Sequence, residues 1–182
     1  MTISTDPRKV FVIYGRHDRA KEEVFAFLRM IGLLPIPWGE AVRLTKSNAP
    51  FIGKILEAAL PQAQAVVVLL TGDDEVQLIK SEFFIEDNED RELSSTPYQP
   101  RPNVIFEAAM ALSTWHADKT ILVEVGKDVK ICRGIVGRHR IKLSNHLKHR
   151  WELVNSLKAA GCDVRVPNNE LLRTIGNFDF EW

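Results

Sequence analysis

A chain of 182 residues, 45% hydrophobic and 26% charged, is typical of one globular domain with a single core. Its 24 basic and 24 acidic residues give a net charge of zero, so the total charge does not indicate nucleic acid or a membrane as a partner. No apolar run approaches the length of a membrane span, and the start MTISTDPRKV lacks the apolar stretch of a signal peptide. We therefore expect a cytoplasmic protein with no direct nucleic-acid or membrane partner.

Cysteines and charges narrow the function classes further. Cys132 and Cys162 are too few for a disulfide framework, and neither has a Cys or His at metal-ligand spacing, so we expect reduced thiols and no metal site. Residues 73–92 carry nine acidic and two basic residues, whereas residues 127–150 carry eight Lys or Arg, three His and one Asp. This distribution predicts two oppositely charged surfaces.

Strand and helix patterns alternate along the chain. In the first half we predict a strand at 9–14, a helix at 18–32, a strand at 33–38, a loop at 39–50, a helix at 50–63 and a strand at 65–71. In the second half we predict a long acidic loop at 72–102, a helix at 103–115, strands at 119–125 and 138–143, a helix at 146–161 and an edge strand at 163–166. The strand at 65–71, AVVVLLT, is apolar on both faces, as a central strand of a parallel sheet is.

This alternation predicts an α/β fold with a five-stranded, mainly parallel sheet in the flavodoxin-like order and helices on both faces. We place an N-terminal arm at 1–8, the domain at 9–166 and a C-terminal tail at 167–182. Ligands of such sheets bind beyond the carboxyl ends of the strands. The turns after the first three strands and the residues around Glu107 all belong to that rim.

The first turn, residues 15–18, joins a strand to a helix, where free backbone N–H groups favour an anion such as phosphate. Asp18 is equally explained as the N-cap of the helix, and Arg16 and His17 as surface residues. The chain contains neither GxGxxG nor GxxxxGK[ST], so the sequence does not support a Rossmann or ATP-hydrolysing site.

Two further polar features lie on the rim. In the turn TGDD, residues 71–74, one of the carboxylates of Asp73 and Asp74 can cap a helical turn while the other accepts hydrogen bonds from a ribose. Trp38 follows the second strand, where it can stack on a base or close the top of the core.

Glu107 is the unusual residue of the stretch RPNVIFEAAMAL, residues 101–112. Three of its four neighbours at helical spacing are apolar, so a place on the wet face of a helix is disfavoured. We expect Asn103 to be the N-cap and the nearby positive end of the helix to keep Glu107 ionised. An ionised carboxylate in an apolar cleft suits cleavage of a glycosidic bond, because it stabilises the positive charge that builds up on the sugar. Nicotinamide bound to ribose is a cationic leaving group that departs neutral, so one carboxylate can suffice.

The motifs VIYGRHD, LLTGDDE and RPNVIFEAAMAL, in this order and spacing, resemble the TIR-like (Toll/interleukin-1 receptor type) domains of bacterial nucleotide-binding effectors. Those effectors accompany anti-phage systems of the CBASS and Pycsar kind, and the resemblance runs from about residue 9 to 166. It implies a flavodoxin-like TIR fold and an NAD⁺ glycohydrolase that releases nicotinamide and leaves ADP-ribose or a cyclised form, with NAD⁺ as substrate and no cofactor.

The resemblance also assigns site residues. Glu107 matches the glutamate of those enzymes, and the residues expected to line the dinucleotide site are Tyr14, Gly15, Arg16, Asp73, Asp74, Arg101 and Asn103. The sequence departs from the family at Ala108 and Ala109, where a Gly is frequent, and at Tyr14, where a His is common. Both departures leave the glutamate in place.

The resemblance also implies binding partners for this chain. We expect a homo-oligomer that becomes active by self-association, and a sensor of cyclic nucleotides on another module or chain. Two other functions fit the same rim: a nucleoside deoxyribosyltransferase, which shares the fold class and the single glutamate, and a non-catalytic TIR scaffold or nucleotide sensor.

Overall fold

Five parallel strands form the central sheet of the protein. The computed structural model describes residues 5–75, 98–114, 117–127, 129–131 and 137–181. The sheet strands, in chain order, are β1 (Lys9–Ile13), β2 (Leu34–Ile36), β3 (Ala65–Leu70), β6 (Thr120–Val125) and β7 (Arg140–Leu143). Their spatial order is β2-β1-β3-β6-β7 with parallel pairing throughout, which confirms the predicted α/β fold and its flavodoxin-like order.

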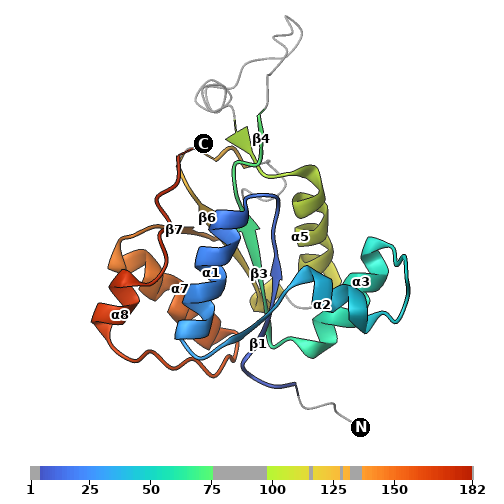
Figure 1. Ribbon diagram of the computed structural model, residues 1–182, viewed down its shortest axis with the longest axis horizontal. Helices are drawn as coiled ribbons and strands as arrows, with labels where there is room; N and C mark the ends of the chain where they lie inside the picture. The colour runs from blue at the N-terminus through green and yellow to red at the C-terminus, as the bar shows by residue number, and fades with distance from the viewer. Residues whose placement is uncertain (1–4, 76–97, 115–116, 128, 132–136, 182) are drawn as a thin grey trace, which may run out of the picture.

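Helices cover both faces of this sheet (Figure 1). The α-helices are α1 (Asp18–Met30), α2 (Trp38–Leu44), α3 (Ile52–Ala59), α5 (Pro102–Thr114), α7 (Leu147–Ala159) and α8 (Asn169–Thr174). Two 3₁₀ turns, η1 (Leu60–Gln62) and η2 (Ala117–Lys119), precede β3 and β6. In the described part of the chain no helix is long and apolar enough to cross a membrane.

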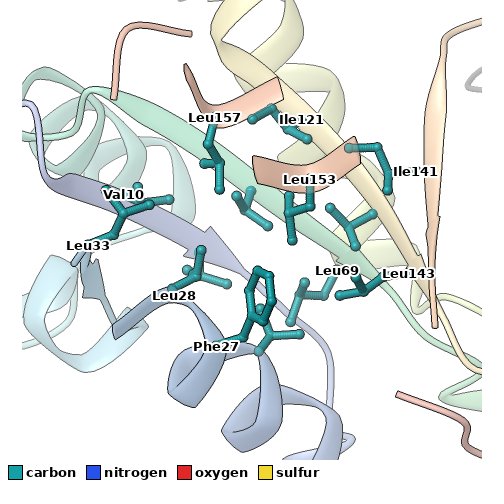
Figure 2. Close-up of a cluster of buried hydrophobic side chains, with 14 of the residues drawn as sticks. Val10, Phe27, Leu28, Leu33, Leu69, Ile121, Ile141, Leu143, Leu153 and Leu157 are labelled. Carbon is teal, nitrogen blue, oxygen red and sulfur yellow. The ribbon is translucent and has the colours of Figure 1, made fainter. Parts of the chain in front are cut away.

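The strands bury alternate side chains on opposite faces because successive side chains of a strand point in opposite directions. Val10 and Val12 of β1 join the core cluster beneath α1 and α7, part of which Figure 2 shows. Phe11 and Ile13 join the cluster beneath α2, α3 and α5. All six residues of β3 are buried, as predicted for the central strand.

The first helix begins and ends close to its predicted limits. Its N-cap is His17 rather than Asp18, because the His17 Nδ1 accepts a hydrogen bond of 3.0 Å from the backbone N–H of Ala20. Asp18 instead forms an ion pair with Lys21 in the first turn. Gly32, with φ of 84°, turns the chain out of the helix, as glycine does at this position.

The predicted loop at 39–50 is partly wrong, because α2 occupies Trp38–Leu44. Pro37 precedes it, and its carbonyl accepts hydrogen bonds from the backbone N–H groups of Glu40 and Ala41. Ala41 is fully buried, so contact with the sheet stabilises a helix too short to form alone. The predicted helix at 50–63 is α3, which gives way to η1 where Pro61 cannot continue an α-helix.

Two other segments differ from prediction. Residues 163–166 form no strand: Asp163 donates its backbone N–H to the carbonyl of Pro7 and Arg165 to that of Ile31, so the segment is tied to turns and not to a sheet edge. At the ends of the predicted loop 72–102, β4 (Asp74–Glu75) pairs antiparallel with β5 (Tyr98–Gln99). Residues 76–97 between them, which hold most of the predicted acidic surface, lie outside the described residues, as does Cys132; Cys162 is a buried free thiol.

The C-terminal tail, left unassigned by the sequence, packs on the domain through α8 and two aromatic residues. Phe178 and Phe180 are 1% and 4% exposed and belong to the cluster beneath α1 and α7. The guanidinium of Arg150, which is 1% exposed, donates hydrogen bonds to the carbonyls of Leu172, Ile175 and Gly176 and to the side chain of Asn145. A buried arginine thus clamps the chain where it leaves α8.

Candidate active site

A cavity of about 580 Å³ opens at the carboxyl end of β1, between the turn that follows this strand and helices α2, α3 and α5. Its volume lies within the range of about 300–1,000 Å³ that is usual for small-molecule sites. Its lining residues are Tyr14, Gly15, Arg16, Trp38, Val42, Pro50, Ile52, Ile55, Arg101, Asn103, Val104 and Glu107. The structure therefore brings together every predicted site residue except Asp73 and Asp74.

Glu107 lies on the side of α5 that faces the sheet and is 7% exposed. Burial raises the pKa of its carboxyl group to about 7. Within the described residues no hydrogen-bond donor contacts this carboxylate. Near pH 7 the protonated and ionised forms are therefore similarly populated.

The expectation that the helix dipole keeps Glu107 ionised is wrong, because burial raises its pKa to about 7. The helix starts at Pro102, and the Arg101 carbonyl accepts a hydrogen bond of 3.2 Å from Ile105, so Arg101 and not Asn103 occupies the N-cap position. Glu107 is then the sixth helical residue, beyond the first turn, where the dipole has little effect. Burial outweighs it.

Two arginines, Arg16 and Arg101, line the cavity together with Glu107. Arg16 is exposed and Arg101 half-buried, and neither side chain has an acidic partner among the described residues. Guanidinium groups bind phosphate oxygens through paired hydrogen bonds. The cavity can therefore accept an anionic ligand at its mouth and a cationic or developing positive charge beside Glu107.

Aromatic and aliphatic side chains form the rest of the wall. The ring of Trp38 stacks on that of Phe11, with centroids 6.2 Å apart, and also lines the cavity, so it packs against the core and leaves a surface for a ligand. Val42, Pro50 and Ile55 complete an apolar wall that the sequence analysis missed. The signal for Val42 and Ile55 was the apolar spacing of α2 and α3, which becomes informative only once α2 is known to be helical; Pro50 lies between the two helices.

Asp73 lies just outside the cavity, beneath the turn that follows β1. Its Oδ1 accepts hydrogen bonds from the backbone N–H groups of Arg16 at 3.1 Å and His17 at 3.0 Å, and its Oδ2 accepts one from the Thr71 hydroxyl at 2.8 Å. The predicted use of these N–H groups for a phosphate is therefore wrong: the protein's own carboxylate occupies them. Asp74, also outside the lining, pairs with Gln99 in the small β4–β5 sheet.

Comparison with known proteins identifies the family. The model of the family described as CAP12/Pycsar effector protein, TIR domain, matches residues 9–145. The chain belongs to this TIR family. The matched range runs from β1 to just beyond β7 and contains every residue that lines the cavity, so the cavity is part of the TIR domain itself.

This TIR chain is also similar to the uncharacterized protein YuaY of Escherichia coli (strain K12). The two are 25% identical over 154 residues, which are 85% of this chain and 46% of YuaY. The chain thus spans about half the length of this curated relative.

Burial of Glu107 predicts a dependence of stability on pH. Its folded pKa of about 7 exceeds the ordinary value of 4.5, so the folded state binds more protons between these values, and stability falls as the pH rises through that window. Glu107→Gln removes this titration. We expect the variant to match the wild type near pH 4.5 and to exceed it by about 2 kcal/mol at pH 8, a value reduced for the opening of the carboxylate to cavity water.

Thermal unfolding of both proteins at pH 5 and pH 8 measures this difference. We expect the melting temperature of Glu107→Gln to exceed that of the wild type by about 4–8 °C at pH 8 and by much less at pH 5. An equal difference at both pH values would show that burial does not perturb Glu107.

Proposed function

We propose that this TIR domain cleaves NAD⁺ at the bond between nicotinamide and ribose, with Glu107 as the catalytic carboxylate. The observation that supports this most strongly is the pairing, in one cavity, of a buried carboxylate with two arginines that have no acidic partner among the described residues. NAD⁺ carries a negatively charged diphosphate and a positively charged nicotinamide, so its charges complement those of the cavity.

The reaction requires little of the protein beyond placement and charge. As the glycosidic bond breaks, its electron pair leaves with nicotinamide, which departs neutral, and positive charge moves to the ribose. The ionised Glu107 stabilises that charge. Water then bonds to the ribose carbon, and its proton passes to Glu107, whose pKa of about 7 suits a proton acceptor, or to solvent. The products are nicotinamide, ADP-ribose and one proton.

The other lining residues would bind and orient the substrate. We assign the diphosphate to Arg16 and Arg101, and a flat ring to the exposed surface of Trp38. Tyr14, Gly15 and Asn103 would complete the contacts that position the ribose beside Glu107. NAD⁺ is the substrate in this proposal, and no further cofactor takes part.

At the level of the organism, we propose an anti-phage effector that self-associates when a cyclic-nucleotide sensor on another module or chain is occupied. Membership of the CAP12/Pycsar effector family supports this role. The basic stretch at 127–150 could contact a second copy, but acidic residues of the same chain neutralise part of its charge. Lys127 pairs with Glu181 at 2.8 Å, and His139 pairs with Glu152 at 3.0 Å.

Two alternatives are weaker on the same observations. A deoxyribosyltransferase acts on nucleosides without phosphate and would leave Arg16 and Arg101 without a role. A scaffold or sensor that only binds nucleotides would gain nothing from a buried carboxylate that destabilises the fold at neutral pH.

Incubation of the purified chain with NAD⁺, with chromatography of the products, separates these functions. The proposal predicts stoichiometric nicotinamide and ADP-ribose or its cyclised form. Exchange of free nucleobases on deoxynucleosides without action on NAD⁺ would indicate the transferase, and saturable binding without products the scaffold. The same assay at several protein and salt concentrations tests self-association, because activity per subunit should rise with concentration.

A further inference from the structure

Asp73 connects two neighbouring strands through the turns at their carboxyl ends. It follows β3, yet its Oδ1 accepts the backbone N–H groups of Arg16 and His17, which follow β1. Thr71 holds the other carboxylate oxygen at 2.8 Å. Three hydrogen bonds thus fix the carboxylate between the segment that follows β3 and the turn that forms one wall of the cavity.

Gly15 permits this close approach. A Cβ atom at position 15 would lie 1.8 Å from the Asp73 Oδ2, far inside the contact limit, so any other residue would displace the carboxylate. The methyl group of an alanine would meet Asp73. The glycine of the VIYGRHD motif and the first aspartate of the LLTGDDE motif therefore form one structural unit.

This unit of Gly15 and Asp73 fixes the backbone position of Arg16. The side chain of Arg16 is exposed and contacts no acidic group among the described residues. Its position therefore depends on the backbone from which it extends. On the other side of the turn, His17 caps α1 through the N–H of Ala20. With both sides held, the Arg16 side chain starts from a fixed backbone position at the wall of the cavity, which lowers the entropy lost when it binds a ligand.

We propose that Asp73 is a positioning residue for the dinucleotide site, which acts through the backbone of Arg16 and does not contact the substrate. This inference rests on the proposed function for the identity of the ligand. It reassigns Asp73 from the ribose contact that the sequence suggested, because both oxygens of its carboxylate already accept hydrogen bonds from the protein. Loss of the carboxylate should weaken NAD⁺ binding about 10-fold and change kcat less than about threefold.

The variants Asp73→Ala, Asp73→Asn and Gly15→Ala test this proposal, with Asp18→Asn as a control that removes an exposed carboxylate from the same helix start. The affinity for NAD⁺ is measured by calorimetry in the Glu107→Gln background, where turnover does not interfere. We expect weaker binding in Asp73→Ala and Gly15→Ala. Asp73→Asn should stay within about threefold of its parent, since the amide oxygen can still accept both N–H groups.

A double-mutant cycle with Arg16→Ala distinguishes positioning from contact. Once Arg16 is alanine, Asp73→Ala should weaken NAD⁺ binding less than twofold further. If Asp73 contacts the substrate, its loss multiplies with that of Arg16 and still weakens binding once Arg16 is alanine. That result would overturn the proposal.

A measurement without ligand keeps the inference separate from the proposed function. In Asp73→Ala the amide protons of Arg16 and His17 should exchange with solvent about fivefold faster or more, with those of β1 unchanged. Unchanged exchange at both residues would show that Asp73 does not hold the backbone of this turn, whatever the protein binds. If NAD⁺ binds but is not cleaved, the hydrolase proposal fails, and the measured affinities still decide the role of Asp73. If NAD⁺ does not bind, the hydrogen exchange of Arg16 and His17 alone decides that role.

Discussion

Glu107→Gln should lower kcat for NAD⁺ cleavage by at least about 1,000-fold while leaving the affinity for NAD⁺ within about threefold. The substitution preserves size and removes the charge, so only the interaction with the positively charged transition state is lost. Burial makes this charge unusually effective, because a carboxylate 7% exposed is poorly screened by water. Initial rates of nicotinamide release and calorimetric binding of NAD⁺ measure the two quantities.

Glu57→Gln on the neighbouring helix α3 is the matched control. Its side chain is 70% exposed and forms an ion pair with Lys54 at 3.7 Å, so its loss should leave both quantities unchanged. A Glu107→Gln enzyme with more than a tenth of the wild-type rate would exclude Glu107 as the catalytic carboxylate. A large loss of affinity with unchanged kcat would instead make it a binding residue.

Arg150→Met should lower the free energy of unfolding by about 3–5 kcal/mol. The side chain is 1% exposed, and its loss would leave the carbonyls of Leu172, Ile175 and Gly176 buried or half-buried without a donor. The ring of Phe178, 4.8 Å from the guanidinium, would also lose its cation contact. Urea unfolding measures the change, and we expect the melting temperature to fall by about 6–15 °C.

Lys148→Met, an exposed position of the same helix, controls for the loss of a positive charge and should change stability by less than about 0.5 kcal/mol. If Arg150→Met unfolds within a degree of the wild type, the tail is not held by this arginine. Proteolysis of the tail in Arg150→Met and not in Lys148→Met would be the accompanying sign of its release.

The sheet followed from the sequence because its strands are strong local patterns. AVVVLLT is apolar on both faces, which only a central strand requires, and the alternation of strand with helix leaves few orders for the sheet. The rule that ligands bind at the carboxyl ends of parallel strands then placed Arg16, Trp38 and Glu107 on one rim, and all three line the cavity.

Other features depend on contacts between distant segments and could not be predicted locally. The helix α2 contains Gly39 and begins after Pro37, a weak local signal that burial of Ala41 overrides. The role of Asp73 depends on a turn 56 and 57 residues earlier in the chain, which no spacing rule reveals.

The sequence contained a signal for the burial of Arg150, but the basic composition of the surrounding stretch obscured it. It lies in a basic stretch and was counted among surface charges, yet it shares the helical spacing of the buried Leu153, Val154 and Leu157. A charged residue at a core position of a helix indicates a buried partner, here the carbonyl groups at the end of α8. That spacing could have predicted that the tail packs on the domain.

The state of Glu107 links stability with the proposed chemistry. Burial raises its pKa to about 7, which costs stability at neutral pH. In the proposed mechanism the same shift gives a group beside the ribose that can gain and lose a proton. The variant that abolishes activity should therefore be the more stable protein at pH 8. A residue kept at a cost to the fold is expected at a functional site.

The most direct test of the central claim is nicotinamide release from NAD⁺ by the purified chain between pH 5 and pH 9. In the proposed mechanism the ionised form of Glu107 is the active one, so kcat/KM should rise about 10-fold per pH unit below its pKa of about 7 and level off above it. Glu107→Gln should show neither the activity nor the rise. Absence of nicotinamide at every pH, or a rate independent of pH across this range, would contradict the account.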